Sequence, residues 1–209
     1  MLFNYYFWDF DGTLFNTYPR VTRAFAKALA SLGISAPFDE VYPLVKVSLQ
    51  AAADHFAPLA DVTPQDILEG YHMYAETEGY ETMTPYPGAS DFLRGVTARG
   101  GHNFLYTHRG PSGIKALEHF GLDTFFTDCV TSADGFPAKP APDALLYLCR
   151  KHALSSSACV MLGDRVIDLD AGKNAGMACA VVDPDGLCPP YDTPYRVRSY
   201  AELSKMMFE

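Results

Sequence analysis

The stretch YYFWDFDGTL, residues 5–14, joins an uninterrupted apolar run to two aspartates and a turn. An apolar run of this length is typical of a parallel strand buried on both faces. Gly12 ends the run in a turn, which leaves Asp9 and Asp11 crowded at the carboxyl end of the strand. Two carboxylates about 4 Å apart repel by roughly 4 kcal/mol at an effective dielectric constant near 20. A bound cation or a shared proton is the usual reason for such a pair, so these residues indicate a chemical site.

The remainder of the chain supplies further strands and helices. Apolar runs predict buried strands at residues 3–8, 103–106, 159–162 and 178–182. Helical patterns separate the later strands, at residues 111–120 and from Pro142 onward. Strands that alternate with helices predict an α/β fold with a doubly wound parallel sheet. The Pro- and Tyr-rich residues 183–198 predict an irregular segment, followed by a last helix at residues 200–207.

Residues 16–85 interrupt this alternation with a segment that is helical throughout. Its first helix places Val21, Phe25, Ala28, Leu29 and Leu32 on one face. Thr63 followed by Pro64 is a favourable start for a later helix. We therefore predict a Rossmann-like core of residues 1–15 and 86–209, with a helical cap of residues 16–85. A helical block inserted directly after the carboxylate turn is positioned to act as a lid.

Composition narrows the class of protein. The net charge of −9 over 209 residues argues against nucleic acid or an anionic membrane surface as the main partner. The five cysteines are odd in number and contain no CxxC pair, which indicates reduced, mostly buried thiols. No signal-peptide pattern and no membrane-length apolar stretch is present in the sequence. We expect a cytoplasmic monomer that acts on a small molecule.

Polar residues follow other predicted strands in the same way. Thr107 comes after the strand at residues 103–106, and Asp164 comes after the strand at residues 159–162. Ligands of open α/β sheets bind outside the carboxyl ends of the strands where the winding reverses. We therefore expect Thr107 and Asp164 to converge with the aspartate pair on one crevice, with Lys139 reaching it from a loop. Carboxylates, a hydroxyl, a lysine and loop amides suit a phosphoryl group held by Mg²⁺.

These motifs resemble the haloacid dehalogenase (HAD) superfamily of phosphohydrolases. The four signatures appear in order: DxDGT at residues 9–13, the hydroxyl of Thr107, Lys139, and GDxxxD with Asp164 and Asp168. The helical insertion after the first motif is similar to the branch that includes phosphoglycolate phosphatases and β-phosphoglucomutases. The resemblance implies a doubly wound core and a hydrolase that acts on phosphoric monoesters.

The resemblance also implies catalytic and metal-binding roles. Asp9 attacks phosphorus and becomes an aspartyl phosphate, while Asp11 protonates the leaving oxygen and then activates water. Mg²⁺ is held by Asp9, by the backbone carbonyl of Asp11 and by Asp164. Asp168 orients or supplements this set of metal ligands. Equally well, Asp168 could simply stabilise the N-terminus of the following helix electrostatically.

Phosphate binding and substrate selection involve other positions. The resemblance implies phosphate contacts from Thr107 and Lys139, helped by loop amides near Gly12 and His108. Arg109 directly follows His108 and adds donors there, either toward substrate or at the surface. Lys46 and Ser48, predicted to lie between helices of the cap, are candidates for touching the leaving group. An exposed loop is as good an interpretation of Lys46 and Ser48.

The resulting hypothesis is a Mg²⁺-dependent phosphatase for a small phosphomonoester, such as a sugar phosphate, phosphoglycolate or a nucleotide. A phosphomutase is the nearest alternative, because such enzymes share the nucleophile and the cap. Dehalogenases of the superfamily lack the second aspartate. A phospho-accepting signalling domain uses similar groups on separate strands, whereas Asp9 and Asp11 share one strand. A silent binding protein would require the loss of a motif residue, and none is missing.

Overall fold

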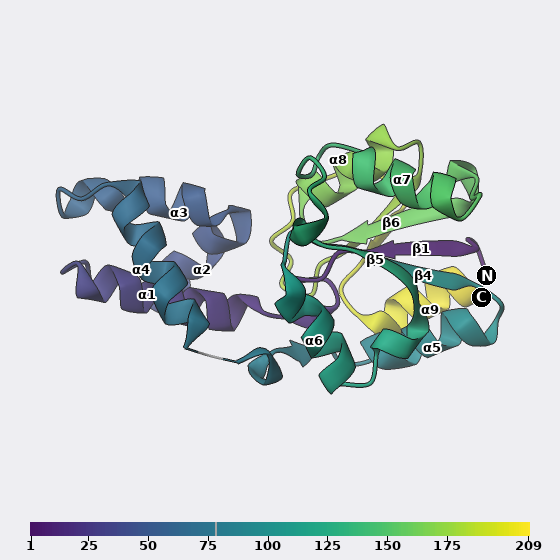
Figure 1. Cartoon of the computed structure of the whole chain (residues 1–209), viewed down its shortest axis with the longest axis horizontal. Coiled ribbons are helices and arrows are strands. Elements are labelled where there is room, and N and C mark those ends of the chain that lie inside the picture. The colour runs from purple at the N-terminus through teal and green to yellow at the C-terminus, as the bar shows by residue number, and fades with distance from the viewer. Residues whose placement is uncertain (78) are drawn as a thin grey trace. The chain divides into compact units, whose positions relative to one another are not determined.

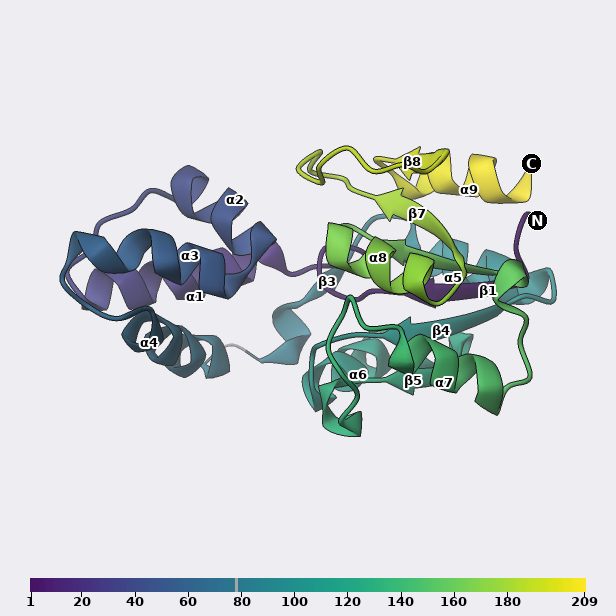
Figure 2. The same cartoon turned by 90° about the horizontal axis from the view of Figure 1, so that it is seen from above.

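The computed structural model describes residues 1–77 and 79–209, and these form two compact units (Figures 1 and 2). The core unit comprises residues 1–15 and 84–209, and the helical unit comprises residues 16–83. Two short strands, β2 (Phe15–Asn16) and β3 (Thr84–Pro85), pair where the chain leaves and re-enters the core unit.

The core unit contains a six-stranded parallel sheet, which confirms the predicted fold class. The strands are β1 (Tyr5–Trp8), β4 (His102–Tyr106), β5 (Phe126–Val130), β6 (Cys159–Gly163), β7 (Ala178–Val182) and β8 (Tyr195–Val197). Their spatial order is β5-β4-β1-β6-β7-β8, and β1 pairs with both β4 and β6. The chain winds outward from β1 through β4 to β5 and then crosses back to β6. The winding thus reverses between β1 and β6, so the carboxyl ends of these two strands flank the expected ligand position.

Both faces of the sheet are covered by helices (Figure 1). The helices of the core unit are α5 (Ala89–Ala98), α6 (Pro111–His119), α7 (Asp143–Lys151), α8 (Val166–Asn174) and α9 (Tyr200–Phe208). Helices α7 and α8 lie on one face, where Phe7, Phe104 and Met161 join their apolar side chains. On the other face, Trp8 packs against Phe92 of α5 and Tyr200 of α9. Burial on both faces explains why β1 is apolar throughout.

Several predicted bounds differ from the structure, and strands β2, β3, β5 and β8 were not predicted; β2 and β3 lie at the ends of the segment expected to be helical throughout. The first strand begins at Tyr5 rather than residue 3, and α7 begins at Asp143 with Pro142 as its N-cap residue. Strand β5 was not predicted because it is an edge strand with mostly half-buried, mixed side chains. Strand β8 lies inside the segment expected to be irregular, so that expectation is wrong for Tyr195–Val197. Strand β8 lies on the opposite edge of the sheet and has three residues, too few to show an alternation of apolar and polar side chains.

The helical unit has a hydrophobic core of its own. Its helices are α1 (Tyr18–Ser31), α2 (Phe38–Val47), α3 (Leu49–Phe56) and α4 (Pro64–Glu76). Phe25, Phe56 and Ile67 are fully buried in this core. The predicted start of α4 is confirmed, because Thr63 forms a reciprocal capping box with Asp66.

Short helices and cysteines complete the description. Single 3₁₀ turns occur at Ala57–Leu59, Tyr80–Thr82, Asp123–Phe125, Ser132–Asp134 and Ser156–Ala158. All five cysteines are free thiols, and each except Cys129 is buried, as predicted. Within residues 1–77 and 79–209, the helices are all too short or too polar to cross a bilayer.

Candidate active site

The turn after β1 places the buried Asp9 side chain in the candidate site. The backbone N–H of Asp9 donates to the carbonyl oxygen of Leu162 at 2.9 Å, which continues the pairing of β1 with β6. Gly12 has φ of 81°, a left-handed conformation that favours glycine, and its N–H donates to the carbonyl oxygen of Phe15. The rings of Phe10 and Phe15 stack with centroids 4.3 Å apart. The carboxylate turn is therefore fixed by both hydrogen bonds and packing.

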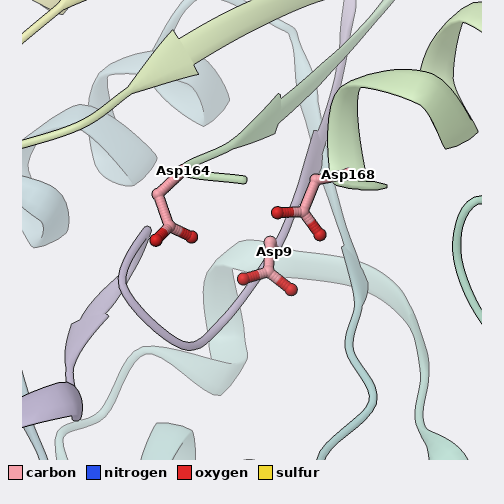
Figure 3. A group of neighbouring side chains, drawn as sticks. All are labelled: Asp9, Asp164 and Asp168. Carbon is pink, nitrogen blue, oxygen red and sulfur yellow. The ribbon is translucent and has the colours of Figure 1, made fainter. Parts of the chain in front are cut away.

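Three buried carboxylates meet in this region (Figure 3). Asp9 follows β1, Asp164 follows β6, and Asp168 lies in the first turn of α8. Carboxylate oxygens of the three residues lie within 4.8 Å of one another. Gly163 permits this approach, because a Cβ atom at that position would lie 2.3 Å from the Cβ atom of Asp168.

Lys139 joins two of these carboxylates. Its Nζ atom lies 2.5 Å from Asp9 Oδ1 and 2.9 Å from Asp168 Oδ1, and its side chain is fully buried. Burial lowers the pKa of Lys139, but the charges of Asp168 and Asp9 more than reverse this, so the pKa is raised overall. Burial, and then the charge of Asp168, raise the pKa of Asp9 to about 6 against the opposing effect of Lys139. Burial and a neighbouring carboxylate thus raise the pKa of Asp9, and the two carboxylates that contact Lys139 raise the pKa of Lys139.

The donor set fits a magnesium ion. Asp9 Oδ2 is buried and accepts no hydrogen bond from the residues that the structure describes. Asp164 Oδ1 accepts a hydrogen bond from the hydroxyl of Thr13 at 3.2 Å. Asp168 is engaged through both oxygens, because Oδ1 binds Lys139 and Oδ2 accepts the backbone N–H of Arg165 at 3.1 Å. Carboxylate oxygens and a surplus of negative charge are what a hard divalent cation requires.

The loop after β4 contains three of the predicted positions. Thr107 is buried, and its hydroxyl accepts the backbone N–H of Arg109 at 3.0 Å. The ring of His108 turns toward the lysine loop, and its Nε2 accepts the backbone N–H of Lys139 at 2.8 Å. Burial, followed by the charge of Lys139, lowers the pKa of His108 to about 4, so the ring is neutral near pH 7. The His108 ring thus positions the Lys139 backbone.

Arg109 and Asp11 form a half-buried ion pair. Arg109 Nη2 lies 2.5 Å from Asp11 Oδ1, and Arg109 Nε lies 3.1 Å from both carboxylate oxygens. The guanidinium carbon lies 5.6 Å from the centroid of the Phe10 ring. From the sequence, Arg109 could be either a surface residue or a contact to substrate. The structure places it beside Asp11, the second aspartate of the first motif.

Comparison with known proteins identifies the family. Residues 6–182 match the family of haloacid dehalogenase-like hydrolases. The chain belongs to this family. A solved structure similar to this chain is that of a hydrolase from Streptococcus pneumoniae TIGR4, which is 33% identical with a TM-score of 0.70. That likeness covers 99% of this chain and 98% of the other. The resemblance inferred from the four motifs is thereby confirmed.

Two curated relatives in the same family have named activities. The phosphoglycolate phosphatase of Vibrio parahaemolyticus is 29% identical over 181 residues, which cover 81% of this chain and 79% of the relative. The pyrophosphatase PpaX of Halalkalibacterium halodurans is 25% identical over 215 residues, with coverage of 97% and 96%. This chain thus covers more than two thirds of each relative.

Two further residues of this haloacid dehalogenase-like hydrolase support the site and were not predicted. Thr13 is buried, and its hydroxyl donates a hydrogen bond to Asp164. From the sequence, Thr13 was recognised only as a member of the first motif, without a structural role. Tyr200 of α9 donates its hydroxyl to the backbone carbonyl of Thr13 at 2.8 Å. Burial raises the pKa of Tyr200 well above its usual value, so the hydroxyl keeps its proton. No local signal in the last helix indicates this contact.

Lys46 and Ser48, the two candidates in the helical unit of this family member, make contacts within that unit. Lys46 lies within α2 rather than between helices, is buried, and places Nζ 5.5 Å from the centroid of the Tyr18 ring. Ser48 is the N-cap residue of α3 and accepts the backbone N–H of Ala51 at 2.9 Å. The interpretation of Lys46 as part of an exposed loop is therefore wrong, whereas Ser48 lies between α2 and α3 as predicted and is half-buried. Their suggested contact with substrate stays a prediction.

Proposed function

We propose that this haloacid dehalogenase-like hydrolase is a Mg²⁺-dependent phosphatase that cleaves a small phosphomonoester through an aspartyl phosphate on Asp9. The observation that carries the proposal is the buried Asp9 carboxylate, which shares Lys139 with Asp168 and lies beside Asp164. The names of the two curated relatives support a substrate with a phosphate group. The cytoplasmic location and monomeric state expected from the sequence complete the proposal.

In the first chemical step, Asp9 forms a bond to phosphorus and the bond between phosphorus and the ester oxygen breaks. Lys139 holds Oδ1 of Asp9, while Oδ2 accepts no hydrogen bond from the described residues. A lone pair of this carboxylate is thus available for attack. Asp11, two residues along the same turn and ionised in its pair with Arg109, first takes up a proton from solvent and then gives it to the leaving oxygen.

In the second step, water attacks phosphorus and the bond to Asp9 breaks. Asp11, left ionised by the first step, accepts a proton from the attacking water. Inorganic phosphate leaves and Asp9 returns to its starting form. Thr107 and Lys139, with amides of the loops around Gly12 and His108, hold the phosphate oxygens during both steps.

Magnesium binding is assigned to Asp9, Asp164 and the backbone carbonyl of Asp11. Asp168 has both oxygens engaged with Lys139 and Arg165, which favours a role in positioning Lys139 over direct ligation. A bound Mg²⁺ supplies positive charge that offsets the repulsion between an anionic nucleophile and an anionic phosphate. Without it the site holds more carboxylates than cations.

The helical unit is proposed to be the cap that contributes substrate contacts. Its separate hydrophobic core lets it fold as a compact body on the two connections at β2 and β3. Lys46 and Ser48 stay candidates for contacts with the leaving group. Selection among small phosphorylated metabolites would then arise in the helical unit as well as in the core.

Hydrolysis of p-nitrophenyl phosphate tests the proposal. We expect wild type to release phosphate with Mg²⁺ and to lose activity in EDTA, whereas Asp9→Asn should be slower by at least about 1,000-fold, because no nucleophile is left. Asp91→Asn, an exposed aspartate on α5, is the matched control and should retain wild-type activity. Equal rates for wild type and Asp9→Asn would end the proposal. Incubation with a hexose 1-phosphate separates phosphatase from phosphomutase, because the products are free phosphate or an isomer.

A further inference from the structure

Two aromatic side chains flank Thr107 and contact the lysine loop, residues 137–140. Tyr106 is the last residue of β4, and His108 follows two positions later. Residues two positions apart in an extended chain point to the same side. The two rings accordingly meet edge to face, with centroids 6.1 Å apart and an interplanar angle of 83°. Both rings can therefore act on the same neighbouring segment.

Tyr106 contacts the lysine loop at two points. Its hydroxyl donates to the backbone carbonyl oxygen of Pro137 at 3.3 Å, and its ring centroid lies 4.7 Å from Lys139 Nζ. Burial raises the pKa of the Tyr106 hydroxyl, so the group keeps the proton that it donates. The negative face of an aromatic ring attracts a desolvated ammonium. The ring therefore supports the charged end of Lys139, in addition to the carboxylates of Asp9 and Asp168.

His108 holds the other end of the same lysine. Its Nε2 atom accepts the backbone N–H of Lys139 at 2.8 Å, so the proton of the neutral ring lies on Nδ1. Tyr106 and His108 thus contact Lys139 at its ammonium and at its backbone. A lysine side chain is a flexible four-carbon stem, so the position of its ammonium depends on how both ends are held.

We propose that Tyr106 and His108 are positioning residues that hold Lys139 against Asp9 for phosphoryl transfer. This inference rests on the proposed phosphatase function. Lys139 contacts the nucleophile itself, so a displaced ammonium is felt in the chemical step. A displacement of about 1 Å at a reacting centre costs on the order of 100-fold in rate. Loss of either support should therefore lower kcat more than it changes KM.

Two substitutions of His108 test the hydrogen bond. The amide oxygen of glutamine corresponds in reach to Nε2 of histidine, so His108→Gln keeps an acceptor for the Lys139 N–H. The amide oxygen of asparagine corresponds to Nδ1, so His108→Asn has no acceptor that reaches Lys139. Both variants retain the backbone amide of residue 108. The matched control is His102→Asn, at an exposed histidine at the start of β4 whose ring hydrogen-bonds Thr127.

Two substitutions of Tyr106 test the ring. Tyr106→Phe removes only the hydroxyl, whereas Tyr106→Leu also removes the aromatic face. The matched control is Tyr147→Leu on α7, because the ring of Tyr147 likewise lies 5.7 Å from an ammonium, that of Lys151, but at the surface. Tyr106 is buried and His108 is exposed, so Tyr106→Phe and the His108 pair carry the test if Tyr106→Leu does not fold.

Two measurements are made on each folded variant. The first is kcat and KM for p-nitrophenyl phosphate with Mg²⁺. The second is the rate at which an amine-selective acetylating reagent labels Lys139 in EDTA, read by peptide mass spectrometry against the exposed Lys115. The labelling needs no turnover, and it reports directly on the lysine, whose side chain is fully buried in wild type.

We expect His108→Asn and Tyr106→Leu to lose about 10- to 100-fold in kcat, with KM changed by less than about threefold. Both should label Lys139 at least about fivefold faster than wild type. Tyr106→Phe should fall between wild type and Tyr106→Leu, and His108→Gln should recover most of the loss in His108→Asn. The two control variants should match wild type in both measurements.

Wild-type kcat in His108→Asn and in the Tyr106 variants overturns the inference, as does a loss in His108→Gln equal to that in His108→Asn. A loss of kcat without faster labelling of Lys139 also overturns it, because the effect then does not act through the lysine. If wild type releases no phosphate, the proposed phosphatase fails, and the labelling alone then decides whether the two residues hold Lys139.

Discussion

At the residue scale, the charge balance of the buried cluster determines its chemistry. Asp9, Asp164 and Asp168 converge within 4.8 Å, and Lys139 is the ammonium that contacts two of them. Desolvation penalises every one of these charges, and one ammonium does not neutralise three carboxylates. Burial and then the charge of Asp168 raise the pKa of Asp9, and the charges of Asp168 and Asp9 raise the pKa of Lys139 against the effect of burial. A divalent cation would remove the surplus, because its charge pairs with the remaining carboxylates.

The raised pKa of Asp9 predicts a pH-dependent stability in the absence of metal. The pKa is 3.8 for an ordinary aspartate and about 6 for Asp9, so between these values the folded chain binds the proton more tightly than the unfolded chain. A rise in pH through this window therefore lowers the free energy of unfolding, by about 3 kcal/mol in all. The Asp9→Asn variant has no carboxyl group to titrate at this position, so it lacks this pH-dependent loss of stability. In EDTA, its stability relative to wild type should increase from about pH 4 to about pH 7, as measured by urea denaturation.

Magnesium should reverse this difference. Excess Mg²⁺ should stabilise wild type at neutral pH, because the ion binds the ionised carboxylate, and should stabilise Asp9→Asn much less. Asp91→Asn serves as the control for the loss of an exposed carboxylate and should follow wild type under both conditions. A stability difference between wild type and Asp9→Asn that does not vary with pH would contradict the prediction.

At the element scale, the junction between β6 and α8 places two carboxylates from one short segment. Strand β6 ends at Gly163, and α8 begins at Val166. Asp168 bonds the backbone N–H of Arg165, so it caps α8 while its other oxygen holds Lys139. The two readings of Asp168 left open by the sequence are thus both compatible with its contacts.

Gly163→Ala tests how tightly this junction is packed. The added Cβ atom would lie 2.3 Å from Asp168 Cβ, which real atoms do not tolerate, so the start of α8 must shift. We expect a loss of about 1–3 kcal/mol in unfolding free energy and a weaker response to Mg²⁺. Gly110→Ala is the control, since its added Cβ atom would meet its nearest neighbour at 3.5 Å. Equal unfolding midpoints for the two variants in urea would refute the prediction.

The elements that the sequence predicted well are those whose pattern has a single physical cause. Strand β1 is apolar throughout because helices cover both faces of the sheet. The start of α4 was recognisable because the Thr63–Asp66 cap is a local hydrogen-bond pattern. Strand β5 was missed because an edge strand has fewer buried side chains, and its position depends on pairing with β4.

At the scale of the whole molecule, the last helix supports the first motif. Tyr200 of α9 donates its hydroxyl to Thr13, and Thr13 donates to Asp164. The Tyr200 ring also stacks on Trp8, with centroids 6.2 Å apart. Segments separated by nearly the whole chain thus meet at the carboxylate turn after β1.

Tyr200→Phe should weaken this connection without disturbing the packing of the ring. The variant leaves the Thr13 carbonyl oxygen without its buried donor, which should cost about 1–2 kcal/mol of stability and several-fold in apparent Mg²⁺ affinity. Thermal unfolding and a Mg²⁺ titration of phosphatase activity measure the two effects. Tyr195→Phe on β8 is the control, because the Tyr195 ring contacts Phe3 edge-on and the substitution keeps that contact. Identical Mg²⁺ titrations for wild type and Tyr200→Phe would exclude the coupling.

The amino-acid sequence alone determined the parallel sheet, the helical insertion and the identity of the motif residues. These follow from side-chain periodicity and from short-range hydrogen-bond preferences, which act between residues close in the chain. Only the tertiary structure decided that Arg109 pairs with Asp11, that His108 holds the lysine loop and that Tyr200 supports Thr13. Each of these contacts joins different segments of the chain. Such contacts exist only once strand order has brought the segments together, and no local pattern encodes that order.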